Sequence, residues 1–260
     1  MATESRLLVF DIETVPDHVT LEGATKALKP VSQKIVAISF VLARIEKDGG
    51  KESYFIEECR SGGTAQTDEK ELISGFWRLF EREKPRLVSW NGRGFDVPVL
   101  QARAMVHGVP TVNWHTAGDR WNGYRSRYSP DWHCDLMDVL SDYGAAPRMG
   151  LQETAIGIGL PGKLIASGGE VAELVEAGDI EHVRSYCECD VLNLFCLYVR
   201  WALISGRCTV DRHDSSLGRL VDYLQSHRVA KPHFGEFFDR WSQSSQPCPA
   251  GIARSIFTGG

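Results

Sequence analysis

The segment LLVFDIET, at residues 7–14, runs from four apolar residues directly into two acids separated by one isoleucine. The apolar run predicts a buried β-strand. Side chains at positions i and i+2 of a strand point to the same face of the sheet. Asp11 and Glu13 are therefore expected to project from the face on which Leu7 and Val9 pack. A core strand would then direct two negative charges at one place.

The segments that follow alternate between strand and helix patterns. Residues 34–47 and 51–58 flank a DGG turn and predict a β-hairpin. An amphipathic helix over 69–84, a short strand over 86–91 and a helix over 95–108 come next. Three helical segments then cover 151–160, 169–178 and 179–206, the last with Asp179 as its N-cap. This order predicts an α/β domain over residues 1–206.

Two weaker helical patterns, 215–228 and 233–241, follow. They predict a helical extension of the same domain over 207–245, and residues 246–260 are expected to form a flexible tail.

Composition limits the classes of protein to consider. The 260 residues are 43% apolar and 24% charged, which is typical of a folded globular protein. A net charge of −5 argues against a broad basic surface that coats duplex nucleic acid, although one strand end could still enter a cleft. Seven cysteines without a disulfide framework, no signal-like N-terminus and no apolar run of membrane-spanning length predict a cytoplasmic protein with reduced thiols and no membrane contact.

Asp96, in SWNGRGFDVPVL, has two interpretations. An Asp just ahead of a helix with Pro98 in its first turn is a good N-cap, worth about 1 kcal/mol. The same position lies just beyond a strand end, where α/β sheets place ligand crevices, and Asn91 and Phe95 come from the same loop.

The segment YCECD places Tyr186 and Asp190 four residues apart, on one face of the predicted helix. That face continues through apolar positions, so Asp190 falls within a buried stripe where a carboxylate needs partners. Cys187 and Cys189 point to different faces and are expected to be small core residues. Carboxylates gathered in this way repel one another unless cations offset their charge, and hard oxygen ligands suit Mg²⁺ or Mn²⁺. A metal site is the resulting hypothesis.

The order D-x-E, N-x-x-x-F-D and Y-x-x-x-D resembles the DEDD superfamily of 3'-5' exonucleases, in its tyrosine-bearing branch. The three motifs are DIET at 11–14, NGRGFDVP at 91–98 and YCECD at 186–190, and Ser185 stands where the histidine-bearing branch has its histidine. The segments HCDLMDVLSDYG and GLPGK are also similar to stand-alone proteins related to the proofreading domain of family B DNA polymerases. The resemblance covers roughly residues 6 to 245.

This resemblance implies a ribonuclease H-like fold, with a mixed five-stranded sheet flanked by helices. It implies that two divalent ions, Mg²⁺ or Mn²⁺, are held by four acids: Asp11, Glu13, Asp96 and Asp190. Asp11 would bridge the ions, Glu13 and Asp190 would hold the ion that activates water, and Asp96 would hold the other through water. Tyr186 would orient the attacking water. Hydrolysis at a 3' end would release nucleoside 5'-monophosphates.

Substrate contacts are expected at two places. By the resemblance, Thr14, Asn91 and Phe95 touch the terminal nucleotides; the simpler alternative is that Thr14 ends a strand and Phe95 packs under a helix. The loop over 114–133 interleaves Trp and Tyr with Arg, a mixture that stacks bases and screens phosphates. Arg125 and Tyr128 are the candidates there, and an aromatic loop covering the sheet edge is the alternative.

The favoured function is a metal-dependent 3'-5' exonuclease that acts on single-stranded or frayed DNA. An exoribonuclease with the same acids is one alternative, because the motifs do not read the 2'-hydroxyl. A catalytically silent nucleic-acid-binding module is another. A polymerase or repair protein acting in trans would be the partner of a proofreading enzyme.

Asp135 and Asp138 are expected either to cap a short helix or, for Asp135, to contact the metal site indirectly.

Overall fold

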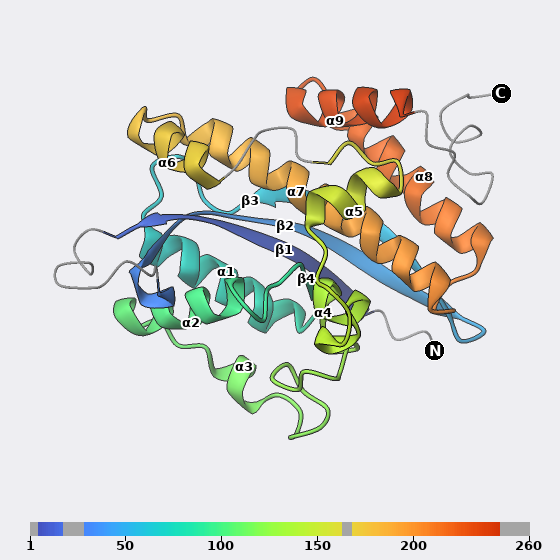
Figure 1. Ribbon diagram of the computed structural model, residues 1–260, viewed down its shortest axis with the longest axis horizontal. Helices are drawn as coiled ribbons and strands as arrows, with labels where there is room; N and C mark the ends of the chain where they lie inside the picture. The colour runs from blue at the N-terminus through green and yellow to red at the C-terminus, as the bar shows by residue number, and fades with distance from the viewer. Residues whose placement is uncertain (1–4, 18–28, 163–167, 245–260) are drawn as a thin grey trace.

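The computed structural model describes residues 5–17, 29–162 and 168–244, and in them a mixed five-stranded sheet has helices on both faces (Figure 1). The strand order is β3-β2-β1-β4-β5. Central strand β1 (Ser5–Pro16) pairs antiparallel with β2 (Gln33–Asp48) and parallel with β4 (Arg86–Ser89). The edges are β3 (Lys51–Ser61), antiparallel to β2, and β5 (His133–Asp135), parallel to β4. The predicted ribonuclease H-like architecture is confirmed.

The alternation of side chains along β1 builds both halves of the core. Leu8, Phe10 and Ile12 pack on one face with α1 (Glu69–Glu83) and α2 (Asp96–His107). Leu7 and Val9 pack on the other face with α7 (Ile180–Ile204). Because residues two apart share a face, this places Asp11 and Glu13 on the α7 side of the sheet, as the sequence predicts.

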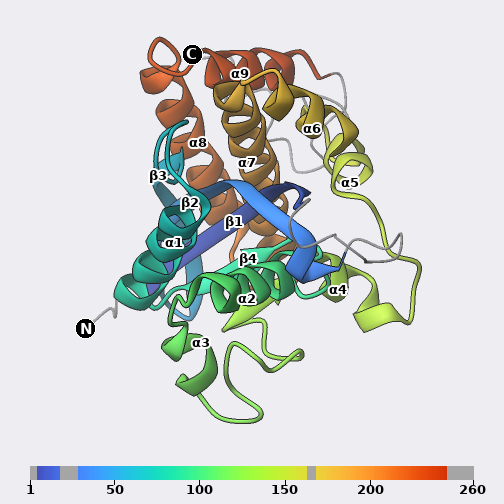
Figure 2. The ribbon, with the colours of Figure 1, turned by 90° about the vertical axis from the view of Figure 1, so that its left-hand side faces the viewer.

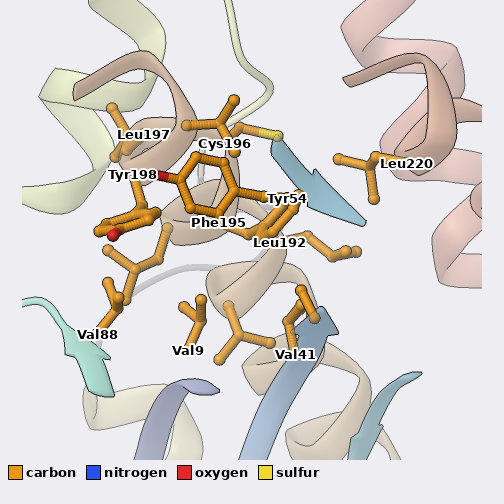
Figure 3. Packing of buried hydrophobic residues seen from close by; sticks show 14 of the residues in the cluster. Val9, Val41, Tyr54, Val88, Leu192, Phe195, Cys196, Leu197, Tyr198 and Leu220 are labelled. Atoms are coloured by element: carbon orange, nitrogen blue, oxygen red, sulfur yellow. The ribbon is translucent and has the colours of Figure 1, made fainter. Parts of the chain in front are cut away.

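Helix α7 is the main element of the core on its face of the sheet. Figure 3 shows its side chains meeting Val9, Val41 and Val88, which project from three neighbouring strands. Leu192, Phe195 and Tyr198 are fully buried there. Apolar packing on this scale holds α7 against the sheet above β1.

The β2–β3 connection is the two-residue turn that the DGG sequence predicts. Gly49 and Gly50 have φ values of 57° and 74°, the left-handed pair that a type I′ hairpin requires. The hairpin turn fixes the register of β3 against β2, and with it the positions of the β3 amides that contact α8.

The outward-facing amides of edge strand β3 are satisfied by side chains and a carbonyl from later in the chain. Tyr54 N donates to Ser216 Oγ (2.9 Å) and Cys59 N to Tyr223 Oη (2.9 Å), both on α8 (Val210–His227). Glu52 N donates to the carbonyl of Arg207 (2.8 Å). α8 therefore covers the edge along much of its length.

The remaining helices follow the predicted order with shifted ends. They are α5 (Leu151–Gly157), α6 (Gly168–Glu176) and α9 (Pro232–Gln243). Asp179 caps α7 as expected, since its side chain accepts from the amide of His182. α8 begins five residues before the predicted start at 215, with Thr209 as its N-cap. Figures 1 and 2 show α8 and α9 beside α7. Lys163 of GLPGK and the predicted tail over 246–260 lie outside the described residues.

The aromatic loop contains structure that its sequence does not predict. A short helix, α3 (Val112–Thr116), opens it, and α4 (Leu136–Leu140) follows β5.

Two 3-10 turns, η1 (Pro30–Ser32) and η2 (Asp142–Gly144), lie in the connections before β2 and after α4.

Among the helices of the described residues, none has the length and apolar character needed to cross a membrane.

A buried ion pair fastens β3 to the start of β4. Arg86 donates to both carboxylate oxygens of Glu52 (2.6 and 3.0 Å) and to the hydroxyl of Tyr198 (2.8 Å). Tyr54 also donates to Glu52 (2.7 Å). Burial alone would raise the pKa of Glu52, but its bonds to Arg86 and Tyr54 outweigh burial and lower the pKa to about 2.

Replacing Glu52 with Gln is expected to lower the free energy of unfolding by about 3 kcal/mol at neutral pH, because the buried Arg86 then loses its buried carboxylate and keeps only the exposed carboxylate of Asp131 (3.2 Å). A carboxylate whose pKa falls on folding stabilises the protein above its ordinary pKa of 4.5, and this contribution disappears as the pH falls toward about 2. The difference between wild type and variant should therefore shrink in acid, as urea unfolding across this pH range would measure.

Glu58→Gln, which removes an exposed pair with Arg60, is the matched control and should cost less than about 1 kcal/mol. Equal stability of Glu52→Gln and wild type at neutral pH would contradict the assignment.

Candidate active site

Asp11 and Glu13 lie side by side in the second half of β1, which continues to Pro16. Their carboxylate oxygens and the Cys187 sulfur all lie within 4.8 Å of one another. The pairing of β1 with β2 shifts register between Glu13 and Thr14, directly after the second acid. Such irregularities bend a strand and re-aim its side chains, so β1 is locally shaped at the position of the acids.

Helix α7 brings Tyr186 and Asp190 to the same place. Both are buried, with exposed fractions of 3% and 1%. The Tyr186 hydroxyl hydrogen-bonds to the Asp190 carboxylate. Burial raises the pKa of Tyr186 far above its ordinary range, and the negative charges of Asp190, Glu13 and Asp11 raise it further. Tyr186 is therefore a neutral phenol at physiological pH, able to donate a hydrogen bond but unable to act as a base.

Asp96 reaches the site from the opposite side of β1, at the first turn of α2. Burial raises its pKa well above the usual range, and the charge of Asp11 adds to this effect. The amide of Ile12 on β1 favours its charged form and lowers the pKa of Asp96, but this effect is smaller than the opposing ones. Phe95, not Asp96, occupies the N-cap position of α2, so the capping interpretation is wrong. Asp96 is aimed at β1 instead.

The loop that carries Asp96 is held by Asp135, at the end of β5. The Asp135 carboxylate accepts from the amides of Asn91 (2.9 Å) and Arg93 (2.8 Å) and also caps α4. The turn is tight: a Cβ at Gly92 would lie 2.4 Å from Cβ of Ser89, closer than real Cβ contacts come. Asp135 therefore fixes the backbone that positions Asp96. Asp138 instead accepts two hydrogen bonds from Arg127.

Two of the four predicted acids, Asp11 and Glu13, form one group of possible metal ligands together with Cys187, and Asp96 and Asp190 lie near enough for charge interactions with Asp11 and Tyr186 respectively. The four acids are all hard oxygen donors. They offer carboxylate oxygens from three separate elements, and Asp96 Oδ1 is buried without a hydrogen-bond partner among the described residues. A buried carboxylate oxygen in that state costs free energy unless a cation or proton meets it. Mg²⁺ and Mn²⁺ match this oxygen-rich set. The acidic cluster is thus able to hold divalent metal.

Cys187 is a neighbour of this cluster that the sequence interpretation missed. Its sulfur lies 3.6 Å from the Asp11 carbonyl and 3.8 Å from Asp11 Oδ2, so it is more than a core filler. Cys189 has the predicted core role, with an exposed fraction of 1%. The signal was available in the sequence, because Cys187 stands three residues before Asp190 and shares its helix face.

The nearby substrate candidates have contacts of their own. Thr14 donates to the side chain of Gln33 (3.0 Å). Asn91 adopts a left-handed conformation, with φ of 60°, in the turn ahead of Asp96. Phe95 is half-buried and packs against the core cluster of α1 and α2. All three lie close in sequence to the acids. The packing of Phe95 matches its simpler structural role, whereas Thr14 does not end the strand, because β1 continues to Pro16.

The aromatic loop divides into a buried and an exposed part. Tyr124 is buried among Phe80, Trp114 and Trp132, and its hydroxyl donates to the Pro85 carbonyl (2.8 Å). This part packs into the core cluster of α1 and α2, whereas the alternative interpretation expects a loop over the sheet edge. Arg127, in contrast to the expected phosphate screening, is bound to Asp138.

Arg125 and Tyr128 lie on the exposed part of this loop. Arg125 is exposed and lines a surface pocket with Arg120 and His115. Tyr128 is 69% exposed, and its ring packs against Tyr143 at 4.7 Å between centroids. Arg93 ties the loop to the Asp96 turn by donating to the carbonyls of Ser126 (2.8 Å) and His133 (3.1 Å).

Comparison with known proteins agrees with this geometry. Residues 25–241 match the family model described as a predicted 3'-5' exonuclease related to the exonuclease domain of PolB. The matched span includes Asp96, Tyr186 and Asp190 and begins after Asp11 and Glu13. A segment of 75 residues is 40% identical to part of the catalytic subunit of DNA polymerase epsilon from Dictyostelium discoideum. That segment is 28% of this chain and 3% of that protein.

The family match extends over far more than half of the chain and includes Asp96, Tyr186 and Asp190, three of the five predicted catalytic residues. The chain therefore belongs to this family of predicted 3'-5' exonucleases related to the exonuclease domain of PolB, a family of hydrolases.

Proposed function

We propose that the protein is a metal-dependent exonuclease that removes nucleoside 5'-monophosphates from the 3' end of single-stranded or frayed DNA. The observation that supports the proposal is the pair Asp11 and Glu13 on β1 beside Cys187 of α7, with Asp96 of α2 and Asp190 of α7 near enough to interact by charge with Asp11 and Tyr186. The similarity to a DNA polymerase subunit favours DNA over RNA as the substrate. A polymerase or repair protein that supplies frayed ends in trans is the partner this activity would serve.

Asp11, Glu13, Asp96 and Asp190 would hold two divalent ions, Mg²⁺ or Mn²⁺. When bound, such ions supply the positive charge that activates water and stabilises the leaving oxygen of a phosphodiester. The carboxylates also fix where the scissile phosphate can sit, because their oxygens come from well-packed elements of the core. Asp135 contributes by holding the backbone turn in front of Asp96.

Tyr186 would orient the attacking water. A phenol whose pKa is raised by burial and by three nearby carboxylates keeps its proton, so its hydroxyl can hold a water in place without removing a proton from it. Its bond to Asp190 sets the direction of the hydroxyl.

Thr14, Asn91 and Phe95 would contact the last nucleotides of the strand. Arg125 and Tyr128 would hold the strand farther from its end, through phosphate screening and base stacking. Their exposure supports this role. The positive charge of Arg125 would attract phosphates locally although the whole chain carries a net charge of −5.

Asp11→Asn is expected to lower the rate of digestion by roughly 10²–10³-fold or more, because it removes charge at the centre of the donor set. The assay follows matched DNA and RNA single strands, labelled at the 5' or the 3' end, with Mg²⁺, Mn²⁺ or EDTA. Digestion from the 3' end gives a ladder with the 5' label and mononucleotide with the 3' label. Asp222→Asn, an exposed acid on α8, is the control and should digest like wild type. Unchanged digestion by Asp11→Asn would overturn the metal assignment, and faster loss of RNA than DNA would assign the chain as an exoribonuclease.

Tyr186→Phe removes one hydroxyl and keeps the ring in place. We expect kcat to fall by about 10²-fold, because a water that is no longer oriented attacks less often. Binding of a single strand, measured by fluorescence anisotropy in Ca²⁺, should stay within about twofold of wild type. An equal loss of kcat and binding affinity would argue for a binding role of this residue instead.

Arg125→Ala and Tyr128→Ala are each expected to raise KM for long single strands by about tenfold, since one stacked base or phosphate contact is worth about 1–3 kcal/mol. A dinucleotide substrate, too short to reach the loop, should be digested as by wild type. Arg240→Ala removes an exposed positive charge on α9 and serves as the matched control. If KM for long strands does not change in either variant, the loop only covers the core.

A further inference from the structure

Glu188 lies between Tyr186 and Asp190 in sequence, but on the opposite side of α7. It is buried, with an exposed fraction of 5%. Its carboxylate accepts four hydrogen bonds. Two come from the end of β3, where Ser61 donates through its amide (2.7 Å) and its hydroxyl (3.1 Å). The other two come from the segment that begins α9, from Lys231 Nζ (2.7 Å) and His233 Nε2 (2.9 Å).

Ser61 connects this carboxylate with the strand that carries the acids. In the sheet, Ser61 is paired with Ser39 on β2, and Ser39 is paired with Asp11 on β1. The hydroxyls of Ser39 and Ser61 lie 2.8 Å apart. Cys187, on the same face of the sheet, has its sulfur 3.8 Å from Asp11 Oδ2. A continuous polar row therefore runs from Asp11 across the sheet to Glu188.

The row fixes the rotation of α7 about its own axis. Apolar packing alone sets the distance of a helix from the sheet but permits small rotations about the helix axis. Directed hydrogen bonds to a buried carboxylate on the helix restrict these rotations. Successive helical residues are about 100° apart, so Glu188 and Asp190 point in nearly opposite directions. Holding Glu188 against β3 and α9 therefore aims Asp190 and Tyr186 at β1.

Lys231 and His233 come from the helical extension that follows α7. Lys231 Nζ also donates to the Cys59 carbonyl (2.9 Å) and lies 4.8 Å from the centre of the Phe234 ring. Figures 1 and 2 show α9 lying against α7 on the side away from the sheet. The extension thus contacts the helix of the acid cluster at the residue between its two functional side chains.

We propose that Glu188, Lys231 and His233 are positioning residues of the exonuclease site. The helical extension formed by α8 and α9 then contributes to activity, because its residues Lys231 and His233 hold Glu188 on α7. The inference rests on the proposed function and deepens it. Glu188 touches neither substrate nor metal; it acts by setting where Tyr186 and Asp190 point. The expected signature is a lower kcat and a weaker metal affinity, with KM for the nucleic acid nearly unchanged.

The test compares disruptive with conservative substitutions. Glu188→Gln, Lys231→Met and His233→Ala should each lower kcat and raise the Mn²⁺ concentration for half-saturation by about 10- to 100-fold, the usual effect of losing a group that orients metal ligands. Lys231→Arg and His233→Gln keep a donor and should restore most of both values. Asp239→Asn removes an exposed pair with Arg228 on the same helical hairpin and should behave as wild type.

Two measurements separate this inference from the proposed function. Binding of Mn²⁺ to the full chain without nucleic acid is followed by electron paramagnetic resonance, and digestion of labelled DNA is followed separately. Weaker Mn²⁺ binding by folded Glu188→Gln supports the positioning role even if wild type digests nothing, in which case only the proposed function fails. If wild type digests DNA while Glu188→Gln and His233→Ala keep the wild-type kcat and Mn²⁺ affinity, the positioning role is overturned and the proposed function stands. A variant with lower thermal stability but wild-type kcat and Mn²⁺ affinity also overturns it.

Discussion

Asp11 and Glu13 repel each other, and both repel the acids that arrive from α2 and α7, at a cost of several kcal/mol for a close pair at protein-like dielectric. A chain can tolerate this only if the rest of the fold is stable enough to hold the groups together or if cations share them. The core provides the first condition: β1 is buried between two hydrophobic clusters, and α7 contributes fully buried side chains over most of its length. The carboxylate oxygens allow the second, because bound cations can share them. The same packing that stabilises the sheet therefore supplies the rigidity that a site of like charges needs.

Much of this arrangement could be predicted because it depends on local periodicity. The two-residue period of a strand puts Asp11 and Glu13 on one face, the helical period puts Tyr186 and Asp190 on another, and the two glycines after Asp48 give the hairpin turn. Each inference needs only a few neighbouring residues. The α/β order follows for the same reason. The family resemblance added a fifth strand without placing it, and the three residues of β5 are too short to show any period.

The parts that could not be predicted are those decided by contacts between distant segments. Tyr124 looked like a base-stacking residue, but it fills a space between α1 and α3 that no local pattern reveals. Asp96 had two local interpretations, and the start of α2 decided against the capping one, because Phe95 occupies the N-cap position. Glu188 appeared as one more charge in YCECD, whereas its partners Ser61 and His233 lie 127 and 45 positions away. Burial of a charged residue within an apolar helix was the visible signal, but the identity of its partners was not.

The way in which α8 covers β3 affects how copies of this chain meet one another. An uncovered edge strand offers a row of amides on which another chain can build, and this is the usual start of strand-to-strand aggregation and domain swapping. Here Ser216, Tyr223 and the Arg207 carbonyl use amides of that row, and Glu188 uses the amide at its end. The extension that orients α7 also covers the exposed edge of the sheet. Removing the chain from α8 onward would therefore expose the amides of β3 to pairing with another chain, and it would also remove the contacts that position α7.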